Sequence, residues 1–257
     1  MGTFRVPFGD GTLSVSLPDC EVTVAEPAGG DPTDVGEAAA AAVADPHGPA
    51  LGELVDPDDT VAIVVTDLTR ATPDDAFLDV LLSELGRAGV FREQVTVVVG
   101  LGLHRPMTDD ELRSMLGEHA DLAVNHDPED TVTVGQVEGT PVELHRVVAD
   151  ADRVLSTGMV EPHQYAGFSG GAKTVVVGAG GESFIWYTHG PDMLARDGVR
   201  LGRIEGNPFR EAVDAAGDRC GLEFCLNVTH GPAGMLDVAA GRPRAVVEDL
   251  AASARAA

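Results

Sequence analysis

The sequence predicts an α/β fold: a mostly parallel, Rossmann-like sheet with helices on both faces and a small N-terminal β-hairpin extension. Two observations lead to this prediction. Short runs of β-branched residues, such as VAIVVTD at 61–67, have the length and composition of strands buried on both faces. Segments with apolar residues at helical spacing separate these runs, and this alternation is typical of a parallel sheet covered on both sides.

The first 45 residues differ from the rest and are predicted to form an extension of hairpin and helix. Residues 11–27, GTLSVSLPDCEVTVAEP, alternate between apolar and polar side chains, which predicts an antiparallel hairpin. Residues 36–46, GEAAAAAVADP, predict a short helix. The whole chain, 1–257, is then expected to form one domain with this extension at its start.

The first strand–helix–strand unit follows. After the strand at 61–67, residues 73–89 place leucines and Phe77 at helical spacing, with acidic residues at the start and Gly89 at the end. Residues 95–100, VTVVVG, predict a second buried strand. A short helix over 107–119 is predicted because Thr108 precedes Glu111 by three residues, the spacing of a capping box.

The second half of the chain repeats the alternation. Residues 153–158 and 222–230 predict strands, because both are rich in β-branched or apolar residues. Residues 207–219 and 242–257 predict amphipathic helices.

The charge of the chain is strongly negative. It carries 42 acidic residues against 17 basic ones, a net charge of −25, and Lys173 is its only lysine. Such a surface repels nucleic acid and anionic lipid, so neither nucleic acid nor membrane is an expected partner. The acidic residues are scattered along the whole chain, which is typical of a protein adapted to high salt, where charges are screened within about 3 Å at 1 M.

This halophilic interpretation predicts that the fold depends on salt. Lowering the salt from molar concentration to about 0.1 M, where the screening length grows to about 10 Å, is expected to cost the chain its compact structure through self-repulsion. Circular dichroism across that range measures the effect. A spectrum that does not change with salt contradicts the interpretation.

The sequence also predicts a cytoplasmic protein. It contains no run of about 18 apolar residues that would span a membrane, and its first residues lack the pattern of a signal peptide. The three cysteines, Cys20, Cys220 and Cys225, are too few for a disulfide framework and are expected to be reduced and buried.

Polar residues gather after three of the predicted strands. Because ligands bind beyond the carboxyl ends of strands in open α/β sheets, these residues are expected to meet at one rim. They are Asp67, Arg70, His104, Arg105, His163 and Lys173.

These residue types suggest a chemistry. An arginine binds a carboxylate in a planar, bidentate manner. Two histidines on different loops suit acid/base catalysis on two faces of one carbon. A lysine among small residues can bond covalently to a carbonyl-type group when burial lowers its pKa, which arginine cannot do. This difference explains a single lysine, Lys173, in a chain that otherwise uses arginine.

A phosphate-binding loop is the alternative. GFSGGAKT at 167–174 lies within one residue of the pattern of such loops, with Ala172 in place of glycine, and the strand at 61–67 also ends in aspartate. That loop should open a helix directly, whereas TVVVGAGG is β-branched and then rich in glycine. A nucleotide hydrolase is therefore the less favoured hypothesis.

Several motifs together resemble one known family. DLTRATP (67–73), GLHRPMTDDEL (102–112), EPHQYAGFSGGAKTVVVGAGG (161–181) and EGNPFREAV (205–213) are similar to the amino-terminal domain of nickel-dependent lactate racemases. The resemblance implies a nickel-pincer nucleotide, a pyridinium mononucleotide whose sulfur and carbon atoms hold nickel. It implies that Lys173 bonds to this cofactor through a thioamide and that His189 is the protein ligand of the metal.

The resemblance also implies a reaction and further contacts. Arg70 would hold the carboxylate of a small 2-hydroxy acid at a substrate site that includes Asp67, which would orient the loop or the cofactor. Hydride would leave the carbinol carbon and return on the other face. His104 and His163 would serve as bases for opposite enantiomers. Proteins of cofactor biosynthesis are implied partners, while the particular acid and the oligomeric state stay open. Residues expected around the cofactor are Thr69, Thr72, Ser169, Gly170 and Gly171, the last three offering backbone amides.

Two features depart from the family pattern. Val177 stands where the family usually has proline. The family also has a carboxy-terminal domain that closes over the substrate, and the 257 residues are expected not to include it. A cofactor-binding module without catalysis, completed by a partner lid domain, is therefore a further hypothesis.

Overall fold

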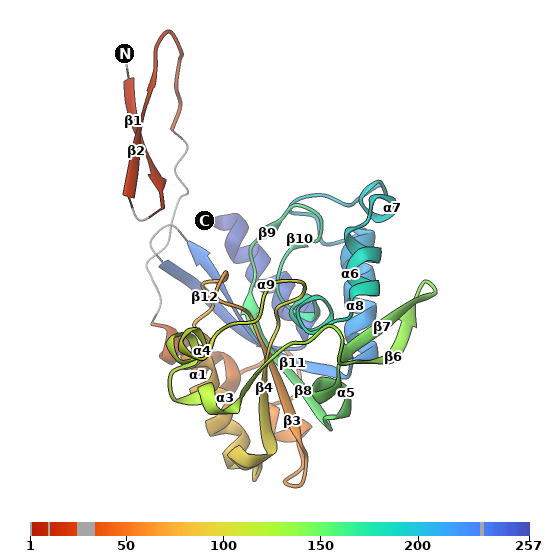
Figure 1. Cartoon of the computed structure of the whole chain (residues 1–257). Coiled ribbons are helices and arrows are strands. Elements are labelled where there is room, and N and C mark those ends of the chain that lie inside the picture. The colour runs from red at the N-terminus through yellow and green to blue at the C-terminus, as the bar shows by residue number, and fades with distance from the viewer. Residues whose placement is uncertain (1, 10, 25–33, 232–233) are drawn as a thin grey trace.

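A computed structural model describes residues 2–9, 11–24, 34–231 and 234–257, and its centre is a six-stranded sheet (Figure 1). All neighbouring strands are parallel except the last pair, in which β12 runs antiparallel to β11. Across the sheet the strands are β12 (Gly234–Gly241), β11 (Leu222–Gly231), β8 (Arg153–Met159), β3 (Val61–Val65), β4 (Val95–Val99) and β5 (Ala123–Asn125). The predicted α/β class with a mostly parallel sheet is confirmed.

The central strand β3 shows why these runs form buried strands. All five of its residues are buried. Because side chains alternate across a strand, Ile63 and Val65 enter the core on one face, whereas Ala62 and Val64 enter the core on the other. A β-branched run without polar interruption therefore fits a sheet that is covered on both faces.

Helices cover both faces of the sheet. On the face of Ile63 lie α1 (Val35–Ala44), α2 (Leu51–Leu54), α3 (Asp74–Ala88) and α4 (Asp109–Leu116), with the 3₁₀ turns η1 (Arg92–Gln94) and η2 (Gly117–Leu122). The opposite face packs against α5 (Arg146–Asp150), α8 (Pro208–Arg219) and α9 (Pro243–Ala256). The predicted helices at 36–46, 73–89, 107–119, 207–219 and 242–257 are confirmed within a few residues at each end.

The predicted helix ends are also found in the structure. Gly89 follows α3 in the left-handed conformation with φ of 96°, which glycine adopts without strain. Before α4, the Thr108 side chain accepts from the backbone N–H of Glu111, and the Glu111 side chain accepts from the N–H of Thr108, the reciprocal bonds of a capping box.

The order of the strands locates a candidate site. The chain places β4 and β5 on one side of β3, and then returns to place β8 and β11 on its other side. The direction of strand addition therefore reverses between β3 and β8. In open α/β sheets, ligands bind beyond the carboxyl ends of the strands at such a reversal.

The N-terminal hairpin exists, but its strands differ from those predicted. They are β1 (Gly2–Phe8) and β2 (Gly11–Leu17), which pair Phe4 with Val15 and Val6 with Leu13. Residues 21–24, predicted as the second strand, form no strand, and 25–27 lie outside the described residues. Residues 2–8 alternate as well as residues 11–17 do and are joined to them by a shorter turn, so they form the pair. The hairpin stands apart from the body (Figure 1).

Smaller elements complete the fold. A second hairpin consists of β6 (Thr131–Val137) and β7 (Thr140–His145), and a short one of β9 (Pro162–His163) and β10 (Gly167–Phe168). After the glycine-rich loop come the π-helix η3 (Thr174–Gly178), α6 (Glu182–His189) and α7 (Pro191–Leu194). The expectation that TVVVG would not open a helix is wrong, because these residues form the helical turn η3 despite their β-branched side chains.

Among the described residues, no helix combines the length and apolar character needed to cross a bilayer. Cys220 and Cys225 are buried as expected, and burial raises the pKa of both thiols, that of Cys220 to about 12. Cys20 is exposed, contrary to expectation, because it follows the projecting hairpin.

Candidate active site

A cavity of about 310 Å³ opens at the carboxyl ends of β3, β4 and β8, where the strand order reverses. Its walls come from the loops after these strands, from the π-helix η3 and from the end of α6. Nine of the predicted site residues line it: Asp67, Thr69, Arg70, His104, His163, Ser169, Gly170, Lys173 and His189. The structure thus brings together side chains more than a hundred positions apart in the sequence.

The loop between β3 and α3 is built around Asp67. Its carboxylate is buried and accepts from the N–H of Thr69 at 3.0 Å and from the Thr69 hydroxyl at 2.5 Å. The backbone N–H of Arg70 donates to the carbonyl of Asp67. Burial opposes ionisation of Asp67, but the hydrogen bonds from Thr69 and His104 outweigh it and hold its pKa below the usual range.

His104 faces Asp67 from the loop after β4. Its Nδ1 lies 2.5 Å from Oδ2 of Asp67, and the side chains are 60% and 7% exposed, respectively. Because Asp67 is an ionised acceptor, Nδ1 of His104 carries a proton and donates it to this bond. The lone pair of the neutral imidazole is then on Nε2, so His104 can take a proton at that atom, with Asp67 stabilising the imidazolium.

His163 lies in the short β9–β10 hairpin. Its Nδ1 accepts hydrogen bonds, whereas Nδ1 of His104 donates one. Nδ1 of His163 accepts from the backbone N–H groups of Tyr165 at 3.2 Å and Ala166 at 3.1 Å. Burial, together with the nearby Lys173 and His189, lowers the pKa of His163 to about 3. The ring is therefore neutral at physiological pH.

Lys173 is a half-buried side chain at the cavity wall. No ion pair or hydrogen bond of its amine occurs among the described residues. Burial, reinforced by the charges of Arg70 and Arg210, lowers its pKa to about 8 from the ordinary 10.5. About a tenth of the amine is then uncharged at pH 7, and the uncharged form is the one that reacts with electrophiles.

Arg210, on α8, fixes the loop before Lys173. Its side chain is completely buried and donates from Nη2 to the carbonyl of Phe168 at 2.5 Å and from Nη1 to that of Gly170 at 3.4 Å. Nη1 also pairs with Asp214 at 3.2 Å. This residue was not predicted as part of the site. The sequence does indicate that Arg210 is buried, because it directly follows Phe209 on the core-facing side of an amphipathic helix.

Backbone N–H groups of the glycine-rich loop were expected to face the cofactor, but two of them form hydrogen bonds within the protein. The N–H of Ser169 donates to the carbonyl of Glu161, and the N–H of Gly171 donates to Oδ1 of Asn227 at 2.8 Å. These two amides are therefore occupied within the protein. Ser169 and Gly170 line the cavity, whereas Gly171 does not.

His189, at the end of α6, presents a free lone pair. Its Nδ1 lies 3.1 Å from the carbonyl oxygen of Ile185, which can only accept, so Nδ1 carries the proton. Nε2 is then unprotonated, makes no hydrogen bond to a described residue and belongs to a ring that lines the cavity. A backbone carbonyl that fixes the tautomer in this way is the usual arrangement for a metal-binding histidine.

Two glycines allow the walls of the cavity to meet. A Cβ at Gly100, after β4, would lie 3.1 Å from Cα of Gly178, and a Cβ at Gly178 would lie 3.1 Å from Cα of Gly100. The end of η3 therefore rests directly on the backbone that leads to His104. This contact sets the distance between the loop of His104 and the segment of Lys173.

Besides Gly171, two further predicted residues lie outside the cavity. Thr72 is buried and accepts from the hydroxyl of Thr66 at 2.9 Å, so it supports the loop rather than facing a ligand. Arg105 turns away and forms two hydrogen bonds with the carboxylate of Glu111, at 2.8 and 2.6 Å. Its guanidinium is held by the acidic N-terminus of α4, which the sequence pattern did not indicate.

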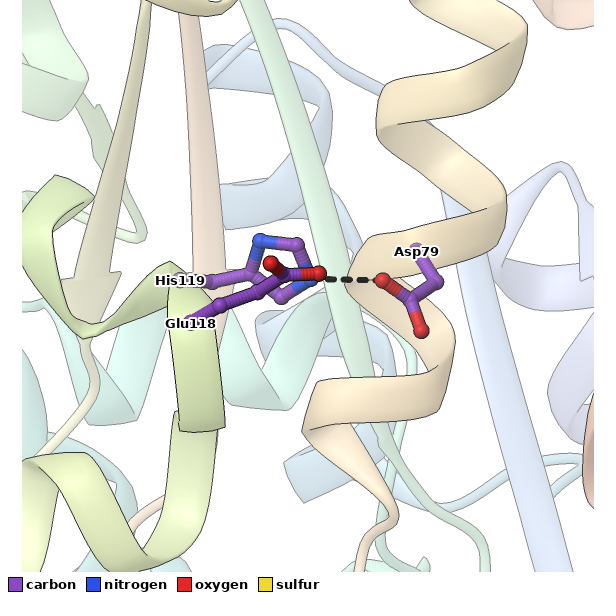
Figure 2. Close-up of side chains that lie close together, drawn as sticks. All are labelled: Asp79, Glu118 and His119. Carbon is purple, nitrogen blue, oxygen red and sulfur yellow. Dashed lines mark hydrogen bonds and ion pairs between the residues drawn. The ribbon is translucent and has the colours of Figure 1, made fainter.

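A second group of candidate metal ligands lies on α3 and η2, outside the cavity. Figure 2 shows Glu118 and His119 facing Asp79 on α3, and their ligand atoms lie within 4.8 Å of one another. However, Nδ1 of His119 accepts from Arg92 at 3.1 Å, so Nε2 carries the proton and donates to Asp79 at 2.8 Å. No lone pair of this imidazole is free, and the Arg92 guanidinium, which also pairs with Asp121, places a positive charge beside the group.

The sequence of this chain is similar to those of known proteins. Residues 8–202 match the family described as the Lactate racemase N-terminal domain. The chain belongs to this family. It is 28% identical over 242 residues to a lactate racemase of Thermoanaerobacterium thermosaccharolyticum, an alignment that covers 89% of the chain and 56% of the relative. It is 30% identical over 185 residues to a lactate racemase of Lactiplantibacillus plantarum, covering 69% of the chain and 43% of that relative.

Two solved structures share the fold. The lactate racemase apoprotein of T. thermosaccharolyticum superposes with a TM-score of 0.84 at 25% identity, over 98% of this chain and 61% of that one. A protein of Thermotoga maritima superposes with a TM-score of 0.61 at 21% identity, over 88% and 59% of the two chains, which is a likeness of fold alone. The chain spans about half the length of the two curated relatives, 56% of one and 43% of the other.

The family match also bears on the phosphate-loop hypothesis. That hypothesis was disfavoured because TVVVG was not expected to be helical, and this reason fails, since a helical turn follows the loop. Membership of the lactate racemase family now argues against a nucleotide hydrolase instead.

Proposed function

We propose that residues 1–257 form the cofactor-binding domain of a 2-hydroxy-acid racemase, which holds a nickel-pincer nucleotide bonded to Lys173. The observation that carries this proposal is the pairing of Lys173 with His189 in one cavity. The first is an amine with a pKa of about 8, and the second is an imidazole with a free Nε2. Few ligands other than a covalently held metal cofactor need both groups.

The residues present fit this cofactor. Lys173 would form the bond to its carbonyl-type carbon, and Nε2 of His189 would bind the nickel, for which a neutral imidazole is a suitable ligand. Ser169, Gly170 and Thr69 border the same space. Gly170 has φ of 77°, and a Cβ there would lie 2.7 Å from Asn227, so only glycine fits at this wall. When bound, the cofactor would supply the acceptor and donor of hydride.

The remaining charges fit a small hydroxy acid. Arg70 is a cation that lines the cavity, and, like Lys173, it forms no ion pair with a carboxylate of the described residues. It would bind the substrate carboxylate in a bidentate manner. His104, held by Asp67, would remove the hydroxyl proton through Nε2, since that atom carries the lone pair. Asp67 would thus act through His104 rather than on the substrate.

The proposal also covers the cellular compartment of the protein, its partner proteins and a second domain. The buried thiols Cys220 and Cys225 suit a reducing cytoplasm, and cofactor biosynthesis proteins would be partners because the chain cannot make the group itself. The relatives are nearly twice as long as the matched region, which favours a second domain that closes the site. A cofactor-binding module without activity of its own is the alternative for the isolated chain.

Production in a host that makes the cofactor tests the proposal. The chain is expected to gain a mass increment on the peptide that contains Lys173 and to bind about one nickel per chain, and with the second domain present to racemise a 2-hydroxy acid. Intact mass, metal analysis and chiral chromatography measure these three outcomes. Cofactor without racemisation, even with the second domain, identifies the binding module, and absence of both increment and nickel contradicts the proposal.

A further inference from the structure

The N-terminal hairpin has one apolar face. Cross-strand partners share a face of a β-sheet, and so do residues two positions apart on one strand. β1 and β2 pair Phe4 with Val15 and Val6 with Leu13. One face therefore carries six apolar side chains, Phe4, Val6, Phe8, Leu13, Val15 and Leu17, and the other includes Thr3, Arg5, Thr12, Ser14 and Ser16.

This apolar face is open to solvent in the structure. Phe8 is 72% exposed, Leu13 48% and Val6 40%, and none of the three apolar clusters that the described residues form includes a residue of the hairpin. A two-stranded hairpin whose apolar side is exposed is marginally stable in water. A contiguous exposed apolar patch is typical of a site that binds another surface.

The charges of the hairpin differ from those of the rest of the chain. The chain has 42 acidic residues among 257, but neither strand of the hairpin contains one. A carboxylate on a face that becomes buried would have to leave water at a large cost in free energy. The absence of acidic residues from both strands therefore favours a surface that another part of the protein covers.

The position of the hairpin indicates what covers it. In Figure 1 the hairpin projects beyond the end of the molecule at which β9 and β10 lie. The cavity opens at this end, and His163 of β9 lines it. A domain that closes the cavity would stand at the same end of the sheet, within reach of the hairpin.

A solved relative has the additional chain that this role needs. The lactate racemase apoprotein of T. thermosaccharolyticum matches 98% of this chain, and the uncovered 2% is shorter than either seven-residue strand, so the match extends into both strands. This chain covers 61% of that protein, which leaves more than a third of it outside the match. The relative therefore combines a counterpart of the hairpin with enough further chain for a second domain.

We propose that the apolar face of the β1–β2 hairpin is the docking surface for the second domain that closes the cavity. The hairpin would add its six apolar side chains to the core of that domain and thereby anchor it at the mouth of the site. This inference rests on the proposed function for the existence of the second domain, but it does not depend on the cofactor or the substrate. A second copy of the chain and the body of the same chain are the other occupants that the experiment distinguishes.

Hydrogen exchange measured by mass spectrometry tests the inference without cofactor or substrate. In molar salt, the peptide that spans residues 2–17 is compared between the chain of 257 residues and the protein that includes the second domain. We expect rapid exchange in the shorter protein and exchange at least about tenfold slower in the longer one. Equal exchange in both proteins overturns the inference. Slow exchange already in the shorter protein also overturns it, and analytical ultracentrifugation then assigns the face to a second copy in a dimer or to the body in a monomer.

Two substitutions on β2 give a matched comparison. Leu13→Asp places a carboxylate on the apolar face, and Ser14→Asp places one on the opposite face at the neighbouring position. With the second domain present, Leu13→Asp should exchange as fast as the shorter protein, whereas Ser14→Asp should stay slow. Both should keep the mass increment at Lys173, since no described residue of the hairpin lines the cavity. Retained protection in Leu13→Asp, or equal loss in Ser14→Asp, contradicts the inference.

Fluorescence reports the burial of this face without introducing a charge into the hairpin. Trp186 is the only tryptophan of the chain, so a variant with Phe8→Trp and Trp186→Phe carries its single indole on the apolar face. Its emission should be that of a water-exposed indole in the shorter protein and should shift to shorter wavelength when the second domain is present. The same emission in both proteins overturns the inference, whether or not the protein is a racemase.

Discussion

Replacing Lys173 by arginine is expected to abolish covalent attachment of the cofactor and, with it, nickel binding and racemisation. Arginine preserves the positive charge, but its guanidinium stays protonated and does not form the bond that an amine with a pKa of about 8 forms. Intact mass and metal analysis of protein from a cofactor-making host measure the loss. The chain has no other lysine, so no neighbouring side-chain amine can replace this one.

His189→Ala provides the matched comparison for this experiment. It removes the free Nε2 at the end of α6 and leaves Lys173 in place, so the organic adduct should persist while nickel is largely lost. Circular dichroism should show both variants folded, because both positions face the cavity. Full nickel and activity in Lys173→Arg would refute the covalent role and most of the proposed function.

The second large effect is expected at the pair Asp67 and His104. His104→Ala should lower racemisation by about 10²–10⁴-fold, because it removes the base from the hydroxyl proton. Asp67→Asn should lower it by about 10⁴-fold, since the amide donates to Nδ1 of His104 and moves the ring proton to Nε2. Initial rates from both enantiomers, in protein that includes the second domain, measure these losses.

Arg105→Ala is the control for this pair. Arg105 follows His104 directly, but its guanidinium binds Glu111 outside the cavity, so the rate should change little. The nickel content of all three variants should equal that of the unaltered protein, which separates loss of catalysis from loss of cofactor. A full rate in Asp67→Asn would contradict the role assigned to the ring tautomer of His104.

Much of the fold follows from short patterns in the sequence. The run at 61–65 lies at the centre of a covered sheet, where both faces of a strand are buried and five consecutive apolar residues are accommodated. Thr108 and Gly89 mark helix ends through local hydrogen bonding and backbone freedom, which do not depend on distant residues. The partner of the strand at 11–17 was misassigned because residues 2–8 and 21–24 alternate equally well.

The composition of the site could be predicted, but its arrangement could not. Parallel strands carry the residues that follow them to one edge, so His104, His163 and Lys173 were expected together. The proton positions on the two imidazoles depend on Asp67 in one case and on turn amides in the other. Arg210 was missed because its role depends on the carbonyls of a loop forty positions earlier in the chain. Such contacts arise only when distant segments meet in the folded protein.

The contact between Gly100 and Gly178 restricts how this sequence can evolve. Each residue fills the space that a side chain of the other would need, so neither mutation can compensate for the other. A substitution at either position pushes the Lys173 segment away from the strand that leads to His104, and a second one at the other position only widens the gap. Homologues that keep both chemical groups should therefore keep both glycines, however far the surrounding sequence drifts.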